Sequence, residues 1–403
     1  MTAKQGLENT KISSHTQKVQ RTWLIFGITL LFTGLTAIGL AVAVLLSHNN
    51  SASTASTSVS RIKSGPPSKE ADLIAPATIA AGTKNVSNDP SYFTRNSALR
   101  KSFYGLAYTP EGSMLPNCGN SLESVIRDVQ IMSQLTDRIR LYGADCDQSA
   151  LVLEAIKRTK VDLGVFLAIY PVDGDPTAYV RQRDLIKDAI LTYGSDHILG
   201  VTVGNEYLLN YLRAHNGSDP DSALARPAVD VMKSNVKDTQ DMLTALRLPK
   251  IMPVGTAEAG SFFNTEVLGM VDYGMSNVHA WFANKTVSYA AEWTINFYQK
   301  KNVKAANKLP NNPTMYLAEA GWPTRSSDLA NADNGVSLAS EANLQIFMDT
   351  FLCQAKKDEI PYFFFEFYDE KWKDATFGGV EGWWGLFNAD RTLKNVTIPD
   401  CSL

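Results

Sequence analysis

The feature that most constrains the fold of this chain is a series of short apolar runs, from residue 103 onward, that alternate with amphipathic segments. Near-continuous apolar runs such as Gly164–Ile169 are typical of parallel strands that are covered on both faces. Eight strands that alternate with helices predict a (β/α)8 TIM barrel. The alternative is an open doubly wound sheet, but no Gly-x-Gly-x-x-Gly follows the first strand and the sequence has no phosphate loop. The predicted strands are Phe103–Tyr108, Arg138–Tyr142, Leu163–Tyr170, Ile198–Glu206, Ile251–Ala257, Gly274–Phe282, Thr314–Ala320 and Tyr362–Tyr368.

The N-terminal part predicts attachment to a membrane. No charged residue occurs from Trp23 to Leu46, and a helix of that length covers about 36 Å, enough to cross a hydrocarbon core of about 30 Å. Lys and Arg residues precede this segment, and none follows it before Arg61, so the positive-inside rule keeps the N-terminus in the cytosol. We therefore expect a cytoplasmic tail over residues 1–22 and a transmembrane signal-anchor over 23–46, as in a single-pass type II protein of the plasma membrane. The alternative is a signal peptide cleaved near Ala41-Val42-Ala43, followed by secretion.

The segment after the predicted anchor has the composition of a spacer. Seven of the ten residues from Ser51 to Ser60 are Ser or Thr, and Gly65-Pro66-Pro67 follows them. Such a segment lacks the apolar pattern needed to fold and resembles an O-glycosylated stalk. We expect the stalk to cover residues 47–101 and the folded domain to cover residues 102–403, outside the cell. Candidate N-glycosylation sequons begin at Asn49, Asn85, Asn216, Asn284 and Asn395.

The four cysteines all lie in the predicted domain. An extracellular location and an even count favour two disulfides, for which three pairings exist. We favour Cys118 with Cys146, which would join the loops after two successive strands, and Cys353 with Cys401, which would fix the C-terminal tail to a late helix.

Charge and ligand-forming residues exclude several classes of function. The net charge is −3 and the predicted domain has no basic cluster, so no nucleic-acid partner is expected. The sequence contains neither a Cys-x-x-Cys motif nor a closely spaced His pair, so neither a metal nor a cofactor is predicted. The oligomeric state stays open.

Two glutamates each close an apolar, strand-like run. Glu206 ends the predicted fourth strand and Glu319 lies near the end of the seventh. A carboxylate at such a position is poorly solvated unless a site uses it, although an ion pair is the alternative for either residue alone. In a barrel, both would lie at the C-terminal face, where active sites form. Two carboxylates facing each other there suit a glycosidase, in which one attacks the anomeric carbon and the other protonates the leaving oxygen.

Several further residues at predicted strand ends are candidates for substrate binding. Tyr142 and His279 follow the second and sixth strands and could contact the nucleophile or the sugar, with ordinary packing as the alternative. Glu366 and Glu370 could bind glucose hydroxyls, or could pair with Lys371 or Lys373. Because a pyranose face packs on an aromatic ring, the aromatic residues of the loops are candidate stacking platforms. These platforms are predicted to include Tyr108, Trp322, Trp372 and Trp384.

The motifs at the strand ends, in order along the chain, are Arg140-Leu141-Tyr142-Gly143, Gly204-Asn205-Glu206, Glu319-Ala320-Gly321-Trp322-Pro323, Glu366-Phe367-Tyr368-Asp369-Glu370 and Trp384-Gly385-Leu386-Phe387. Together they resemble glycoside hydrolase family 17, above all its fungal cell-wall members, some of which carry a type II anchor and a Ser/Thr-rich stalk.

The resemblance implies a retaining endo-1,3-β-glucan hydrolase that remodels cell-wall glucan. Glu206 matches the acid/base of the family and Glu319 its nucleophile, while Asn205 is placed to hydrogen-bond the 2-hydroxyl of the sugar. For Glu206 to hold a proton, its pKa should be raised by partial burial and by the neighbouring carboxylate. The same covalent intermediate would also serve a 1,3-β-glucan transglycosylase. A catalytically idle glucan-binding wall protein is a distant alternative, disfavoured because both carboxylates are present.

Overall fold

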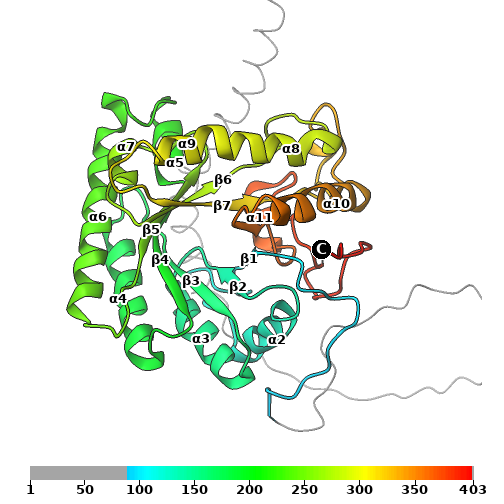
Figure 1. The fold of residues 1–403 in the computed structure, drawn as a ribbon, viewed down its shortest axis with the longest axis horizontal. Helices are drawn as coiled ribbons and strands as arrows, with labels where there is room; N and C mark the ends of the chain where they lie inside the picture. Colours follow the sequence, from blue (N-terminus) through cyan, green and yellow to red (C-terminus); the bar gives the residue numbers. More distant parts are fainter. Residues whose placement is uncertain (1–88, 402–403) are drawn as a thin grey trace, which may run out of the picture. The chain divides into compact units, whose positions relative to one another are not determined.

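The computed structural model describes residues 89–401, in which eight parallel strands close into a barrel (Figure 1). Each strand pairs with the next one along the chain, and β1 pairs with β8. This arrangement confirms the predicted (β/α)8 fold. The strands are β1 (Gly105–Ala107), β2 (Arg138–Arg140), β3 (Gly164–Ile169), β4 (Ile198–Asn205), β5 (Val254–Ala259), β6 (Tyr273–Asn277), β7 (Thr314–Ala320) and β8 (Tyr362–Phe364).

Helices cover the outside of the barrel. Packing between α2 and α3, α3 and α4, and α4 and α6 follows chain order, and α8 packs on α10 on another side of the barrel (Figure 1). The alternation of strand and helix places the carboxyl end of every strand at one face. The helices are α2 (Leu122–Met132), α3 (Gln148–Thr159), α4 (Pro176–Tyr193), α5 (Tyr207–Ala214), α6 (Arg226–Ala245), α7 (Thr265–Leu268), α8 (Val287–Phe297), α9 (Lys304–Ala306), α10 (Glu341–Lys357) and α11 (Lys371–Phe377), with a π-helical turn, Tyr298–Val303, between α8 and α9.

Several strands are shorter than the sequence predicts, mostly at their carboxyl ends. The sixth strand stops at Asn277 rather than Phe282, and the eighth stops at Phe364 rather than Tyr368. In both cases the apolar run continues after the strand because the loops at this face are themselves buried. The fifth strand starts at Val254 rather than Ile251, whose side chain is 94% exposed. The predicted bounds of β7 are confirmed.

The interior of the barrel is filled by aromatic rings rather than left open. Phe166 lies edge-on to Tyr273, Tyr316 and Phe363, with ring centroids 5.3 to 5.7 Å apart. Gly255 makes this packing possible, since a Cβ atom there would lie 2.1 Å from the Tyr273 ring. The interior is therefore a packed core that closes the barrel beneath the site.

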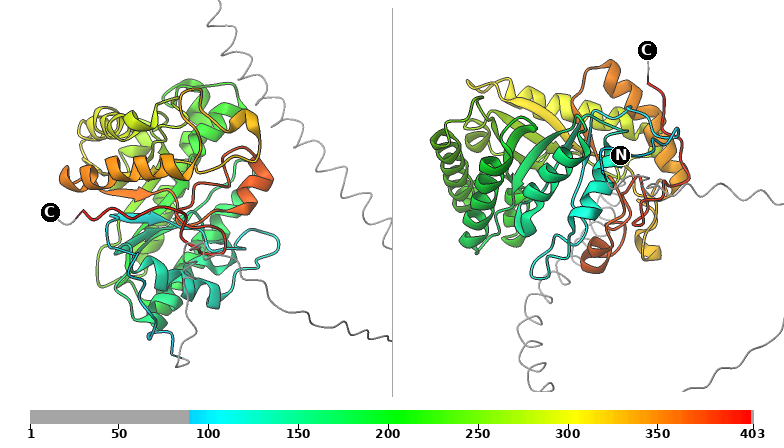
Figure 2. Two further views of the ribbon diagram at one scale, coloured as in Figure 1. Left: turned by 90° about the vertical axis from the view of Figure 1, so that its right-hand side faces the viewer. Right: turned by 90° about the horizontal axis from the view of Figure 1, so that it is seen from below.

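The segment just before β1 and the C-terminal tail of the described chain lie side by side (Figure 2). Arg100 forms an ion pair with Asp400 at 2.6 Å, and the Ser102 hydroxyl donates to the Pro399 carbonyl at 2.5 Å. The disulfide between Cys353 and Cys401 fixes the tail to α10, as predicted. Upstream of residue 102, Leu99 is buried in the core, so the packed part of the chain begins before the boundary predicted there.

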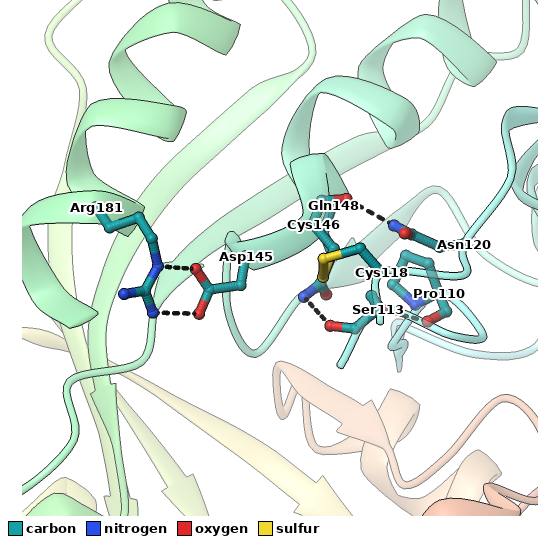
Figure 3. The surroundings of a disulfide bond; sticks show 8 residues. All are labelled: Pro110, Ser113, Cys118, Asn120, Asp145, Cys146, Gln148 and Arg181. Atoms are coloured by element: carbon teal, nitrogen blue, oxygen red, sulfur yellow. Dashed lines mark hydrogen bonds and ion pairs between the residues drawn. A yellow bond between two sulfur atoms is a disulfide. The ribbon is translucent and has the colours of Figure 1, made fainter. Parts of the chain in front are cut away.

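The second disulfide stabilises the loops after β1 and β2, again as predicted. Cys118 is bonded to Cys146, and the Asn120 side chain donates to the Cys146 carbonyl at 2.7 Å (Figure 3). Asp145 forms a two-pronged ion pair with Arg181 of α4, at 2.6 and 2.9 Å. These contacts anchor the loop between β2 and α3 at two adjacent residues, Asp145 and Cys146.

Within residues 89–401, no helix combines the length and apolar character that a membrane crossing requires. The predicted tail, the anchor over residues 23–46, most of the predicted stalk and the sequons at Asn49 and Asn85 lie outside the described residues.

Candidate active site

The end of β4 leaves regular strand geometry in order to present Glu206. Gly204 has a φ of +85°, in the region that favours glycine, and a Cβ atom there would lie 2.6 Å from the end of the Met232 side chain. Glu206 itself is left-handed, with a φ of +55°, and its backbone N–H donates to the Ala257 carbonyl of β5 at 3.2 Å. A non-glycine residue adopts this conformation only where its surroundings hold it. This turn joins β4 to α5, and it sets the direction of the half-buried Glu206 side chain at the end of the strand.

Glu319, by contrast, lies within β7, at a point where the pairing register with both neighbouring strands shifts, and is only 5% exposed. The Tyr142 hydroxyl donates to its Oε1 atom at 2.8 Å, and the His279 ring nitrogen Nε2 lies 2.8 Å from its Oε2 atom, as a donor would. The Arg140 guanidinium lies 3.5 Å from Oε1. Three donors from β2 and from the segments after β2 and β6 therefore surround one carboxylate.

Arg140 and Asn277 connect the two glutamates. The guanidinium donates to the side-chain oxygens of Asn205 at 2.9 Å and of Asn277 at 3.2 Å. The Asn277 amide donates in turn to Glu206 at 3.1 Å and to Asn205 at 3.2 Å. The side-chain oxygen of Asn205 thus accepts two hydrogen bonds, which leaves its amide N–H groups as the donors available to a bound sugar.

The surroundings push the two carboxyl groups toward opposite protonation states. Burial, and then the Glu319 charge, raise the pKa of Glu206 above its ordinary value. Burial also opposes ionisation of Glu319, but the His279 hydrogen bond and the Arg140 charge outweigh it and lower the pKa of Glu319. Two neighbouring titratable groups separated in this way are the usual arrangement of an acid and a nucleophile.

The segment after β8 adds a second group of charges. The Lys373 ammonium contacts Glu366 at 2.5 Å and Glu370 at 3.4 Å, and both carboxylates are almost fully buried. The indole N–H of half-exposed Trp372 donates to Glu370 at 2.6 Å. Both glutamates therefore form the ion pair with Lys373 that was the alternative to sugar binding. The ammonium also lies 4.6 Å from the centre of the Phe365 ring.

Three aromatic residues predicted as stacking platforms are buried instead. Tyr108 is 1% exposed and its hydroxyl donates to Asp128 at 2.9 Å. Trp322 has no exposed surface, and its indole N–H donates to the Leu338 carbonyl. Trp384 is also fully buried and packs edge-on against His279, with centroids 4.8 Å apart. None of the three offers a free ring face, so the predicted stacking role is wrong for Tyr108, Trp322 and Trp384.

Other candidate functional residues are not predicted from the sequence. The strand-end motifs contain Arg140 but assign it no role, and they do not include Asn277, which ends a strand at the same face as Glu206 and Glu319. Glu381 is half-buried, and burial raises its pKa, while His279 and Lys373 oppose that shift. For Arg140, the signal in the sequence is its place at the start of the Arg140-Leu141-Tyr142-Gly143 motif at a strand end. In the part of the chain that the structure describes, no cluster of His, Cys, Asp and Glu has the arrangement of a metal site.

The barrel and the paired glutamates at its C-terminal face define a glycoside hydrolase domain. Residues 105–385 match the BtgE/BtgC glycoside hydrolase domain, and the chain belongs to this family. The match agrees with the resemblance to glycoside hydrolase family 17 in the strand-end motifs.

Known relatives and solved structures resemble the same part of the chain. A protein from Aspergillus flavus named as a probable glucan endo-1,3-beta-glucosidase, btgC, is 34% identical over 323 residues, which are 76% of this chain and 45% of that protein. This chain therefore spans less than half the length of that relative. A glycoside hydrolase family 17 beta-1,3-glucanosyltransferase from Rhizomucor miehei has the same fold, with a TM-score of 0.59, 22% identity, and coverage of 74% of this chain and 98% of that one. An active-site mutant of the Rhizomucor enzyme in complex with laminaritriose matches equally well, at a TM-score of 0.59 and 22% identity over the same shares of the two chains.

Proposed function

We propose that this chain is a retaining endo-1,3-β-glucan hydrolase that remodels cell-wall glucan. The observation that carries the proposal is the network at the carboxyl ends of the strands, in which Asn277 bonds Glu206 and Arg140 contacts both Asn277 and Glu319. The raised pKa of Glu206 and the lowered pKa of Glu319 support it. The relative named as a glucan endo-1,3-beta-glucosidase supports the choice of substrate. Because the large aromatic side chains are buried, we expect a glucan chain to bind along the loops around these two glutamates.

The first step forms a covalent glycosyl-enzyme. A Glu319 oxygen attacks the anomeric carbon while the bond from that carbon to the leaving oxygen breaks, and Glu206 gives its proton to that oxygen. Tyr142, His279 and Arg140 keep Glu319 ionised and orient it for attack. The Asn205 amide donates to the 2-hydroxyl, a contact that strengthens as positive charge develops on the sugar ring.

The second step releases the sugar. Glu206, now ionised, takes a proton from an incoming water, whose oxygen bonds to the anomeric carbon as the ester to Glu319 breaks. Two displacements at the same carbon restore the β configuration. Glu206 is protonated again and Glu319 is again free, so the cycle closes without a further reactant.

Transglycosylation is the second candidate, because a sugar hydroxyl can replace that water. The half-exposed indole of Trp372 supports this alternative, since it would hold an acceptor sugar beside the site. The glucanosyltransferase name of the Rhizomucor neighbour points in the same direction. A glucan-binding protein without activity is disfavoured, because simple binding has no need for two carboxyl groups with opposite pKa shifts.

The proposed location is the plasma membrane, with residues 23–46 as a type II anchor and the barrel facing the wall. The uncharged run and the basic residues before it support this location. N-terminal sequencing of the protein purified from membranes tests it. We expect the run to be retained, whereas a mature chain starting after about residue 43 would show cleavage and secretion.

The function is tested by incubating the full-length chain with linear β-1,3-gluco-oligosaccharides and following product mass, together with Glu319→Gln. Shorter products that the variant does not form are expected from a hydrolase. Products longer than the substrate would instead show a transglycosylase. Proton NMR of the first product tests retention, and an initial α-anomer would refute the double displacement.

A further inference from the structure

A third glutamate lies beside the proposed acid/base. Glu258 occupies the carboxyl end of β5, next to the end of β4, and is 4% exposed. Among residues 89–401 it forms no ion pair, and its two oxygens accept backbone N–H groups. Oε2 accepts from Leu208 at 2.9 Å and Oε1 from Ala259 at 3.0 Å. A buried acid without a basic partner is uncommon, which calls for a physical reason.

The hydrogen bond to Leu208 holds the turn that carries Glu206. Leu208 is the second residue of α5, and Glu206 is the left-handed residue that caps this helix. The side chain of Glu206 accepts no bond from the first turn, so the free N–H groups there depend on another acceptor, and the Glu258 carboxyl is one. The Glu206 N–H also donates to the carbonyl of Ala257, the residue before Glu258. Two hydrogen bonds, from the backbone N–H groups of Glu206 and Leu208, thus fix this turn to β5.

We propose that Glu258 is a positioning residue, which fixes the turn between β4 and α5 so that the Glu206 carboxyl reaches the leaving oxygen of the substrate. The inference rests on the proposed function. The Glu206 carboxylate lies close enough to affect Glu258. Burial, and then the Glu206 charge, raise the pKa of Glu258 well above its ordinary value.

The proposal predicts a loss that depends on the leaving group of the substrate. A glucan leaves as an alkoxide unless Glu206 protonates it, whereas a dinitrophenolate leaves without a proton. A misplaced Glu206 should therefore slow cleavage of laminaripentaose and spare 2,4-dinitrophenyl β-laminaribioside. The ratio kcat/KM is the appropriate quantity, because it reports the first displacement and is insensitive to the later release of the sugar.

The experiment compares both substrates in the full-length wild type, Glu258→Ala and Glu258→Gln. For Glu258→Ala we expect kcat/KM to fall about 10- to 100-fold on laminaripentaose and by less than about threefold on the aryl substrate. Glu258→Gln retains one acceptor and should show the same pattern at about 3- to 10-fold. If Glu258→Ala does not fold, the Gln variant decides the question.

Asn264→Ala is the matched control. Asn264 is also 4% exposed, accepts two backbone N–H groups at the start of α7, and lines the same small cavity as Glu258. Its loss should lower thermal stability and change both substrates by the same factor. An equal change on both substrates in the Glu258 variants, or no change at all, would overturn the proposal. A wild type that cleaves neither substrate would instead refute the proposed function.

Discussion

The ends of β4 and β7 carry the same residue type in two different settings. Glu206 follows a glycine-dependent turn, is half-buried, and receives one side-chain hydrogen bond, from Asn277. Glu319 lies within β7, is buried, and is surrounded by Tyr142, His279 and Arg140. The difference indicates that donors, rather than burial, decide which carboxyl has the lowered pKa. Burial acts on both groups, and only Glu319 has enough donors to reverse its effect.

The largest effect is expected from removing the carboxylate of β7. Glu319→Gln keeps the size of the side chain but removes the nucleophile, so kcat on laminari-oligosaccharides should fall by about 10⁴-fold or more. The measurement is reducing-sugar release in single-substrate assays. Residual activity above a few per cent of wild type would contradict the assignment of Glu319.

A smaller loss is expected at the end of β4. Glu206→Gln removes a proton donor but leaves the attacking group intact, so kcat/KM on oligosaccharides should fall by about 10²- to 10⁴-fold. Cleavage of an aryl glycoside with a good leaving group should change far less. If both substrates lost the same factor, Glu206 would have a role other than proton transfer.

The fold and the two glutamates could be predicted because their signals are local. The apolar runs of the strands and the Asn205-Glu206 pair can each be recognised within a few residues of the chain. The contacts of Arg140 with Asn277 and Glu319 join residues 137 and 179 positions apart, which no local pattern reveals. The same limit applies to Glu258, whose partner on α5 lies 50 positions away.

The aromatic residues show a different limit. An exposed ring that binds sugar and a buried ring that fills a core are the same residue type, so Trp322 and Trp372 could not be told apart by sequence. The structure separates them, since Trp322 is fully buried and Trp372 is half-exposed. The early ends of β6 and β8 have a related cause, because the apolar residues that follow them pack around His279 rather than continue the sheet.

Removing one donor from the group around Glu319 should have a smaller effect. Tyr142→Phe deletes the hydroxyl that donates at 2.8 Å, so the pKa of Glu319 should rise and the acidic limb of the kcat/KM profile should move to higher pH. The rate at the optimum should fall by about 10-fold. The alkaline limb, assigned to Glu206, should stay in place. A shift of the alkaline limb alone would mean that Tyr142 acts on the acid/base.

The smallest effects are on stability, and they have opposite signs at the two strand ends. The raised pKa of Glu206 means that its stabilising effect is complete below the ordinary value of 4.5 and is lost as pH rises through the folded value. The lowered pKa of Glu319 means that its stabilising effect is present above 4.5 and is lost as pH falls through the folded value. At about pH 7.5, Glu206→Gln should therefore raise Tm by about 2 °C and Glu319→Gln should lower it by a similar amount.

Thermal unfolding of the two variants between about pH 3 and pH 8 checks this pair of signs. Asn264→Ala provides the control, since it removes a helix cap without changing a charge and should shift Tm equally across the range. As pH falls toward the folded pKa of Glu319, the difference between wild type and Glu319→Gln should shrink. The Glu206→Gln variant should converge on wild type below the ordinary carboxyl pKa. If the curve of Tm against pH ran parallel to that of the wild type for both variants, the two carboxyls would have the same ionisation in the folded protein. The strand ends would then differ in geometry alone.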